Sequence, residues 1–155
     1  MRVTKRFPGI IIYIILFSMI TKAYAHCEIP CGIYDDSLRV ALIEEHIGTV
    51  EKSMKTIIDL SKEKNINYNQ LVRWIDNKEA HAEKIQMIVS QYFMNQRIKP
   101  ATTEEKKEYE RYVKELTLLH QILIYSMKCK QTTDIAHITK LRELTAEFKK
   151  SYFSK

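Results

Sequence analysis

The segment SLRVALIEEHIGTVEKSMKTIIDLSK, residues 37–62, decides the fold class because it carries a clear helical pattern. Its apolar residues recur at intervals of four and three, the spacing that places side chains on one face of an α-helix. These residues are Ile43, Ile47, Val50, Met54 and Ile57. A helix with one apolar face must bury that face against another element, so the segment predicts a helical core.

Three further segments continue this pattern towards the C-terminus. The second helix is predicted at Asn69–Arg97, after the polar loop Lys64–Asn67, with a stripe of Leu71, Ile75, Ala82, Ile85, Val89 and Tyr92. The third ends near Lys130 and carries Tyr109, Val113, Leu116, Leu119, Leu123 and Ser126 or Met127. The fourth carries Ile135, Ile138, Leu141, Leu144, Phe148 and Tyr152. All three stripes have the period of a helix rather than that of a strand.

Glycine and proline are sparse in this region, which favours long helices. After Tyr34 the chain contains one glycine, Gly48, and one proline, Pro100. Pro100 is expected to end the second helix, and a hydroxyl of Thr102 or Thr103 is expected to cap the third. Four helices with short connections predict an all-α fold, an antiparallel up-down four-helix bundle.

Composition and charge exclude several other classes of protein. The chain has 155 residues, of which 45% are hydrophobic and 28% charged, values typical of one globular domain. Its net charge of +6 comes mostly from the first 25 residues, which hold four basic residues and no acidic one. Without them, 21 basic and 19 acidic residues leave a net charge of +2. We therefore expect no nucleic-acid partner.

Residues 1–25 have the three parts of a secretory signal peptide. A basic start, MRVTKRFPG, precedes the apolar run IIIYIILFSMI at 10–20, and the small-residue ending Ala23-Tyr24-Ala25 follows. Eleven apolar residues are fewer than the roughly 20 that a membrane-spanning helix needs. An uncleaved signal-anchor is the alternative. We expect cleavage between Ala25 and His26, and an exported protein, periplasmic or secreted, with no membrane attachment afterwards.

The segment HCEIPCGIY, residues 26–34, would then begin the mature chain, and it permits two interpretations. In an exported protein, Cys27 and Cys31 could form a disulfide. Alternatively, the free amine of His26, the amide nitrogen and thiolate of Cys27 and the thiolate of Cys31 could bind one metal ion. Two nitrogens and two sulfurs in a plane favour Ni(II) or Cu(II) over tetrahedral zinc.

The same nine residues resemble the nickel hook of the nickel-containing superoxide dismutases, His-Cys-x-x-Pro-Cys-Gly-x-Tyr. The resemblance implies one nickel ion per subunit, held by His26, Cys27 and Cys31, with the His26 imidazole as an axial ligand of the oxidised state. It also implies dismutation of superoxide to hydrogen peroxide and dioxygen by Ni(II)/Ni(III) cycling, and a homohexamer of four-helix bundles. Tyr34 corresponds to the tyrosine that orders water over the open face of the metal.

The sequence departs from the family pattern around the axial imidazole. Asn77 stands where the family has an arginine, and Glu44, Glu45 and Glu79 are candidate replacements for its carboxylate. We interpret Cys129 as a buried thiol. Trp74, Tyr92 and Phe93 are interpreted as core or interface residues. The histidines at 46, 81, 120 and 137 are interpreted as scattered surface or packed residues.

Two other functions are also compatible with the sequence, besides that of a superoxide dismutase. One is an exported nickel- or copper-binding protein that uses the same chelate without turnover. The other is a helical adaptor stapled by a Cys27–Cys31 disulfide. The aromatic content favours an oligomer over a monomer, because the chain has more aromatic side chains than the core of one narrow bundle easily accommodates. These side chains are Trp74, Phe93, Tyr109, Tyr112, Tyr125 and Tyr152.

Overall fold

The computed structural model describes residues 34–154, and these form four long helical segments with no strand among them. The elements are α2 (Asp36–Leu60), α3 (Tyr68–Met87) continued by the π-helix η1 (Ile88–Arg97), α4 (Lys106–Gln131) and α5 (Ile135–Phe153). This confirms the all-α four-helix bundle. The predicted leader and the segment 26–33 lie outside the described residues. Within the described part, no helix is long and apolar enough to cross a membrane.

Polar side chains fix three of the four helix starts. Asp35 accepts a hydrogen bond from the Leu38 amide at 2.9 Å, and so caps α2. Asn67 and Asp134 do the same for α3 and α5. Each cap satisfies an amide that the first turn of a helix leaves without a partner.

The start of α4 differs from the prediction that Thr102 or Thr103 caps it. Residues 102–105 form a turn in which the Glu105 amide donates to the Thr102 carbonyl at 3.2 Å. Glu105 is the N-cap residue, and its side chain makes no capping hydrogen bond. The threonines lie inside the turn, so α4 begins several residues later than their hydroxyls suggested.

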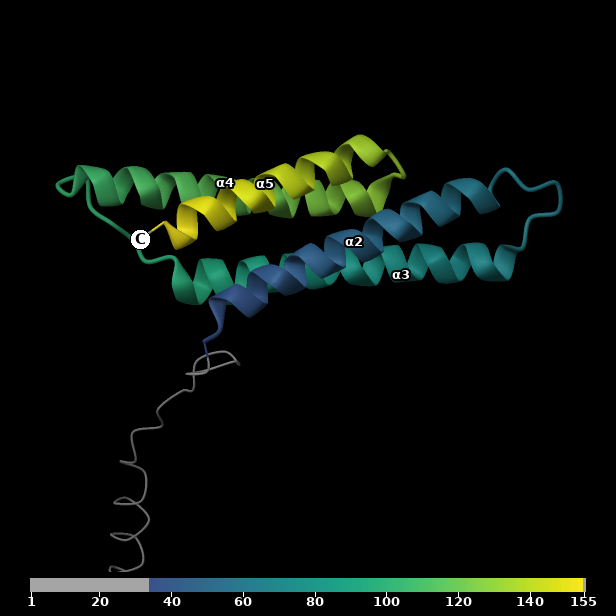
Figure 1. Cartoon of the computed structure of the whole chain (residues 1–155), viewed down its shortest axis with the longest axis horizontal. Coiled ribbons are helices and arrows are strands. Elements are labelled where there is room, and N and C mark those ends of the chain that lie inside the picture. Colours follow the sequence, from purple (N-terminus) through teal and green to yellow (C-terminus); the bar gives the residue numbers. More distant parts are fainter. Residues whose placement is uncertain (1–33, 155) are drawn as a thin grey trace, which may run out of the picture. The chain divides into compact units, whose positions relative to one another are not determined.

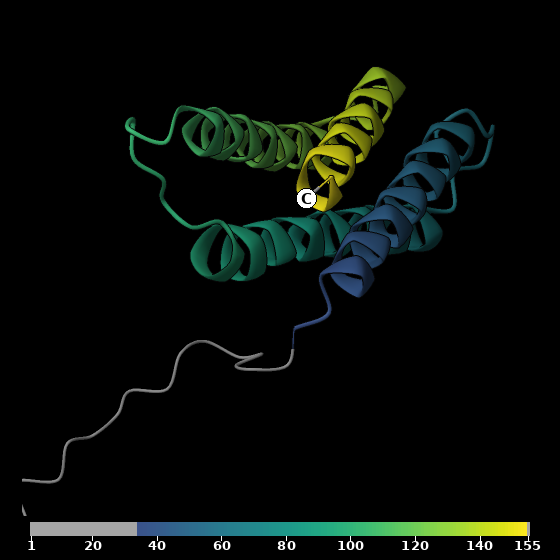
Figure 2. The same cartoon turned by 60° about the vertical axis from the view of Figure 1, so that its left-hand side comes forward.

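Neighbouring helices contact each other in reverse order along the chain, which shows that they run in opposite directions. Between α2 and α3, Ser53 contacts Asn77 and His46 contacts His81. The same reversal holds for α2 with α5 and for α4 with α5, through Glu51–Arg142, Glu44–Lys149, Lys114–Glu147 and Tyr125–His137. Figures 1 and 2 show the resulting pairs, α2 beside α3 and α4 beside α5.

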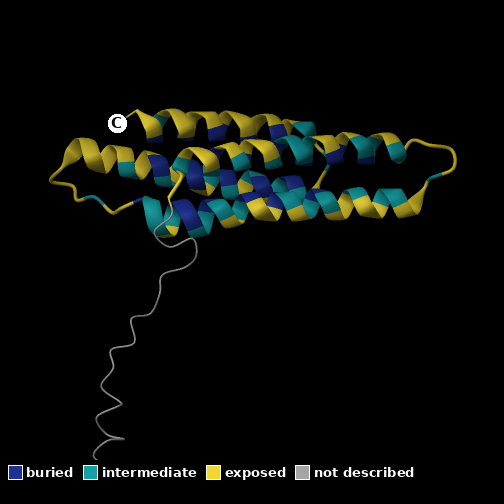
Figure 3. Ribbon diagram, turned by 60° about the horizontal axis from the view of Figure 1, so that its bottom comes forward, coloured by how far each residue is buried: buried dark blue, intermediate teal, exposed yellow. Residues whose placement is uncertain are grey.

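The core lies along the inward faces of all four helical segments (Figure 3). The predicted stripe of α2 is buried throughout, and that of α5 is buried from Ile138 onwards. Two stripes are partly wrong, because Ile75 on α3 and Tyr109 and Val113 on α4 are 36–42% exposed. Of the two alternatives Ser126 and Met127, Ser126 is the buried one. On α4 the buried positions are Glu115, Leu118, Leu119, Ile122, Ser126 and Cys129, so its inward face is turned relative to the prediction.

Aromatic rings fill the core where η1 meets α5. Phe93 packs edge-on against Phe148 and Tyr152, with ring centroids 5.0 and 5.5 Å apart, and against Tyr92 at 5.1 Å. Tilted and edge-on pairs of this kind stabilise beyond the area that they bury. Phe93 and Tyr152 are therefore buried in the core of the single chain, and neither ring is left exposed for an interface with a neighbouring subunit.

Candidate functional site

Of the four predicted site residues, the structure describes Tyr34, which lies two residues before α2. His26, Cys27 and Cys31 lie outside the described residues. Tyr34 is 45% exposed, so its ring is accessible to solvent on part of its surface. The part of the predicted site that the structure describes is therefore Tyr34 and the side chains around it.

Asp36, in the first turn of α2, binds side chains from two other helical segments. Its carboxylate accepts two hydrogen bonds from Arg97, at 2.9 Å from Nε and 2.8 Å from Nη2. It also accepts one from the hydroxyl of Tyr92 at 2.5 Å and one from the hydroxyl of Tyr152 at 2.7 Å. We call these four residues the Asp36 clamp, because they join the start of α2 to the ends of η1 and α5.

The Asp36 clamp is partly buried, and this strengthens its charge-assisted hydrogen bonds. The side chains of Asp36 and Arg97 are 17% and 27% exposed. Burial alone would raise the pKa of Asp36, but the hydrogen bonds from Arg97, Tyr92 and Tyr152 outweigh it and lower the pKa. Asp36 is therefore ionised, and the bond that it accepts raises the pKa of Arg97.

The two phenols of the clamp are held in their protonated form. Burial, followed by the hydrogen bond to Asp36, raises the pKa of both Tyr92 and Tyr152 to about 12. A neutral hydroxyl can donate to the carboxylate, whereas a phenolate would repel it. The clamp is thus a single fixed charge pair with two neutral donors.

The π-helical geometry of η1 explains why two of its side chains reach the same carboxylate. A π-helix bonds residues five apart, as in the bond from the Ile98 amide to the Phe93 carbonyl at 2.9 Å. Tyr92 and Arg97 are also five apart, so they lie on one side of η1. In a regular α-helix that spacing would turn them away from each other. The sequence pattern predicted one continuous helix here and gave no signal of this change.

Tyr34 packs against the outer side of the clamp. The Arg97 guanidinium carbon lies 4.5 Å from the centre of the Tyr34 ring, a cation–π contact. The Tyr92 ring lies 6.0 Å from it in a tilted arrangement. Arg97 therefore has two tasks, because it binds Asp36 through its nitrogens and supports Tyr34 through its face. Sequence reasoning identified Tyr34 but missed Asp36, Arg97 and the second role of Tyr92.

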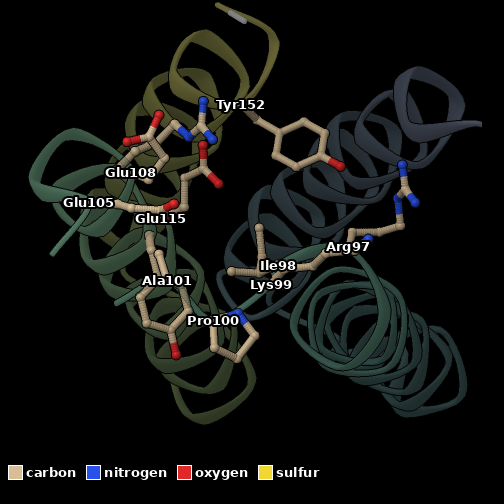
Figure 4. A pocket seen from close by; sticks show the side chains of 11 residues that line it. Arg97, Ile98, Lys99, Pro100, Ala101, Glu105, Glu108, Glu115 and Tyr152 are labelled. Carbon is tan, nitrogen blue, oxygen red and sulfur yellow. The ribbon is translucent and has the colours of Figure 1, made fainter. Parts of the chain in front are cut away.

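A pocket of about 370 Å³ adjoins the clamp on the side of the η1–α4 connection. Arg97 and Tyr152 belong both to the clamp and to its lining. Figure 4 shows Glu105, the N-cap residue of α4, gathered with Glu108 and Glu115 of that helix on one side of the pocket and Arg97 on the other. The lining combines acidic and basic side chains, so the pocket is polar and carries no single dominant charge.

Two of the three candidate replacements for the family carboxylate bind other partners, and the third, Glu45, is exposed on α2. Glu44 pairs with Lys149 at 2.9 Å, and Glu79 lies 3.3 Å from the ammonium of Lys78. Asn77 donates to the Ser53 hydroxyl at 2.9 Å. The carboxylate and the guanidinium that the structure places beside Tyr34 are instead those of Asp36 and Arg97.

Two of the four histidines of the bundle, His46 and His81, lie in contact with each other. The Nδ1 atoms of His46 on α2 and His81 on α3 lie 3.1 Å apart. His120 is exposed on α4, and His137 lies 4.0 Å from Asp134. Within residues 34–154, no three His, Cys, Asp or Glu side chains are grouped as a ligand set for a metal. His46 and His81 are packed residues, as predicted, but the prediction did not foresee that antiparallel packing brings these positions, 35 residues apart, into contact with each other.

Cys129 is buried, as predicted, and is a free thiol. Burial raises its pKa to about 11, well above the usual range of a cysteine. At neutral pH its sulfur is therefore protonated and shielded from solvent.

In a comparison with protein families, the chain matches the model described as nickel-containing superoxide dismutase over residues 21–155. The match includes the hook segment 26–34 and the whole of the described bundle. Searches of curated proteins and of solved structures found no match.

Proposed function

Because this chain belongs to the family of nickel-containing superoxide dismutases, it is an oxidoreductase that uses nickel, and we propose that His26, Cys27 and Cys31 hold the metal. The family match over residues 21–155 is the observation that supports the activity and the use of nickel. Superoxide is the substrate expected for a member of this family. The reaction converts two superoxide ions and two protons into hydrogen peroxide and dioxygen.

The donor set of residues 26–31 fits nickel. Two thiolates and two nitrogens supply the soft, strongly donating ligands that suit a tetragonal ion. Cys129 cannot supply either thiolate, because it is buried and its pKa is raised to about 11. When bound, nickel supplies one-electron redox chemistry between Ni(II) and Ni(III). Free thiolates are required for this binding, so the proposal excludes a Cys27–Cys31 disulfide in the active enzyme.

The described residues support the hook at its C-terminal end. Asp35 fixes where α2 begins, and the Asp36 clamp ties that first turn to η1 and α5. Tyr34 is held against Arg97 and Tyr92 with part of its ring in solvent. In this position Tyr34 orders water at the entrance of the site and excludes anions larger than superoxide.

The same proposal includes export and assembly. Cleavage after Ala25 would create the free amine of His26, which an extended chain would convert into an amide, a much poorer donor. Assembly into a homohexamer is supported by apolar side chains that the single chain leaves exposed on α3 and α4. They include Tyr68, Val72, Tyr109, Val113, Ile124 and Met127.

Three measurements on the purified mature protein test the proposal together: its N-terminal sequence, its nickel content and its rate of superoxide dismutation. We expect His26 at the N-terminus, one nickel per subunit and rapid turnover. Nickel without turnover would show a metal-binding protein, and a metal-free chain with a Cys27–Cys31 disulfide would show an adaptor. Sedimentation of the same sample is expected to show a hexamer, and a fully active monomer would refute the assembly.

Cysteine variants provide the matched control. Cys27→Ser and Cys31→Ser are each expected to abolish stoichiometric nickel binding and activity, because a hydroxyl near neutral pH is a hard, protonated donor. Cys129→Ser is expected to retain both. Normal dismutation by a form that keeps even one residue before His26 would contradict the role of the amine.

A further inference from the structure

His46 and His81 form a contact that the proposed dismutation does not use. The two side chains project from the middle of α2 and of α3, and both are partly exposed. Their Nδ1 atoms are 3.1 Å apart, and their rings meet edge-on at an angle of 79° with centroids 4.9 Å apart. Two basic ring nitrogens at this distance can share one proton, with one ring donating and the other accepting.

The pair is uncharged near neutral pH. Burial lowers the pKa of His46 first, and the neighbouring His81 and Lys84 lower it further, while Glu45 acts in the opposite direction. Burial and then Lys84 also lower the pKa of His81. Neutral imidazole is the form that binds metal ions, so these rings have lone pairs available at physiological pH.

The distance between the two nitrogens also fits a shared metal ion. Imidazole nitrogens bind zinc and similar ions at about 2.0–2.1 Å, so two of them on one ion lie roughly 2.9–3.4 Å apart. The observed 3.1 Å falls in this range. To bind an ion, each ring has to turn so that its Nδ1 lone pair points at the ion, and the ring that donates from Nδ1 then carries its proton on Nε2 instead.

The surrounding contacts hold the two helices at this spacing. On one side of the pair Asn77 donates to Ser53, and on the other Tyr92 donates to Asp36. Both contacts join α2 to the α3–η1 segment, so the histidines meet between two fixed points. A preorganised pair loses less conformational entropy when it binds a ligand.

We propose that His46 and His81 form an auxiliary binding site for a borderline divalent cation, such as Zn(II), Ni(II) or Cu(II), independent of the hook. Imidazole nitrogens select these ions over Mg(II) and Ca(II), which prefer oxygen ligands. Within the described residues no third His, Cys, Asp or Glu completes a ligand set there, so water fills the other positions. Such a site exchanges its metal readily.

Zinc chloride added to the nickel-loaded mature protein tests the site by equilibrium dialysis, with nickel and zinc measured in the same samples. We expect one zinc per subunit in addition to the nickel. His46→Gln and His81→Gln are each expected to weaken zinc binding at least tenfold. His120→Gln, which changes an exposed histidine on α4, is the matched control and should bind zinc like the wild type.

Two further measurements keep the result independent of the hook and of folding. The Cys27→Ser, Cys31→Ser double variant should keep the zinc site, and thermal unfolding should show that each glutamine variant is folded. Nitrogen NMR of the imidazoles should show zinc-dependent shifts at Nδ1 of both rings. Zinc binding that is lost in the double cysteine variant, or that is unchanged in both histidine variants, would overturn the proposal.

Discussion

A charged side chain lies near each end of α5, the partly buried Asp36 at one end and the buried Lys78 at the other, and the two charges are satisfied in different ways. At the C-terminal end, Asp36 receives hydrogen bonds from side chains of η1 and α5. At the other end, the ammonium of Lys78 donates to the backbone carbonyls of Lys130 and, at 3.3 Å, of Thr132. We call this second arrangement the Lys78 cap, since it satisfies the carbonyls that end α4.

The Lys78 cap has a structural role alone, whereas the Asp36 clamp also supports Tyr34 of the proposed site. The Lys78 cap binds backbone atoms at a helix end, where a cation is favoured by the helix dipole, and its ammonium also pairs with the adjacent Glu79. The Asp36 clamp binds side chains, and one of them, Arg97, supports Tyr34 through its other face. Changes at the Lys78 cap should therefore affect stability, whereas changes at the Asp36 clamp should affect stability and catalysis together.

The largest effect is expected from Asp36→Asn. The amide keeps the size of the carboxylate but leaves the Arg97 cation without its counter-charge. We expect the free energy of unfolding to fall by about 2–4 kcal/mol, in the range for breaking a partly buried ion pair. Turnover per bound nickel should fall as well, because Arg97 would no longer hold Tyr34 in place. Urea unfolding and superoxide dismutation at known nickel content measure the two effects.

Lys78→Met tests the other side of the comparison. Methionine keeps most of the apolar stem but cannot donate to the two carbonyls, and a loss of about 1–3 kcal/mol in the free energy of unfolding is expected. Turnover per bound nickel should stay at the wild-type value. A fall in turnover at full nickel loading would contradict the claim that the Lys78 cap affects stability without affecting catalysis.

Tyr92→Phe and Tyr152→Phe should have smaller effects. Each removes one of four hydrogen bonds to Asp36 while keeping the ring in the aromatic cluster. We expect each to lower the free energy of unfolding by about 0.5–1.5 kcal/mol. Because the two bonds share one acceptor, the double variant should differ from the sum of the single variants. Strict additivity in urea unfolding would contradict a shared acceptor.

The helices could be predicted from the sequence because their apolar residues recur every three or four positions. The predicted α2 stripe from Ile43 to Ile57 is buried in full. On α4 the same method placed Tyr109 and Val113 inside, although both are exposed. That helix carries apolar residues on more than one face, so periodicity alone could not choose which face turns inward.

In the proposed site, too, the part formed by consecutive residues could be predicted from the sequence, and the part formed by residues far apart in the chain could not. The hook motif lies within nine consecutive residues, so the sequence displays it directly. The Asp36 clamp joins residues 56 to 116 positions apart, and a π-helix aligns two of them. His46 and His81 likewise meet only because α2 and α3 pack antiparallel. Such contacts depend on helix register, which a single sequence does not reveal.

The smallest expected effect is a shift in the alkaline titration of the clamp tyrosines. Burial and the hydrogen bond to Asp36 raise the pKa of Tyr92 and Tyr152 to about 12 in the folded protein, from an ordinary value of 10.0. A raised pKa in the folded state contributes stability below the unfolded value, and this stability is lost as the pH rises from about 10 through 12. Ultraviolet absorbance of phenolate should therefore show two tyrosines that ionise late.

The variants at the two ends of α5 should separate in this titration. Asp36→Asn removes the negative charge that opposes ionisation, so both late tyrosines should titrate at lower pH, though still above 10 because burial remains. Lys78→Met acts at the other end of α5 and should leave the late titration where it is in the wild type. An identical titration in wild type and Asp36→Asn would mean that burial alone sets these pKa values and that the clamp adds no electrostatic coupling.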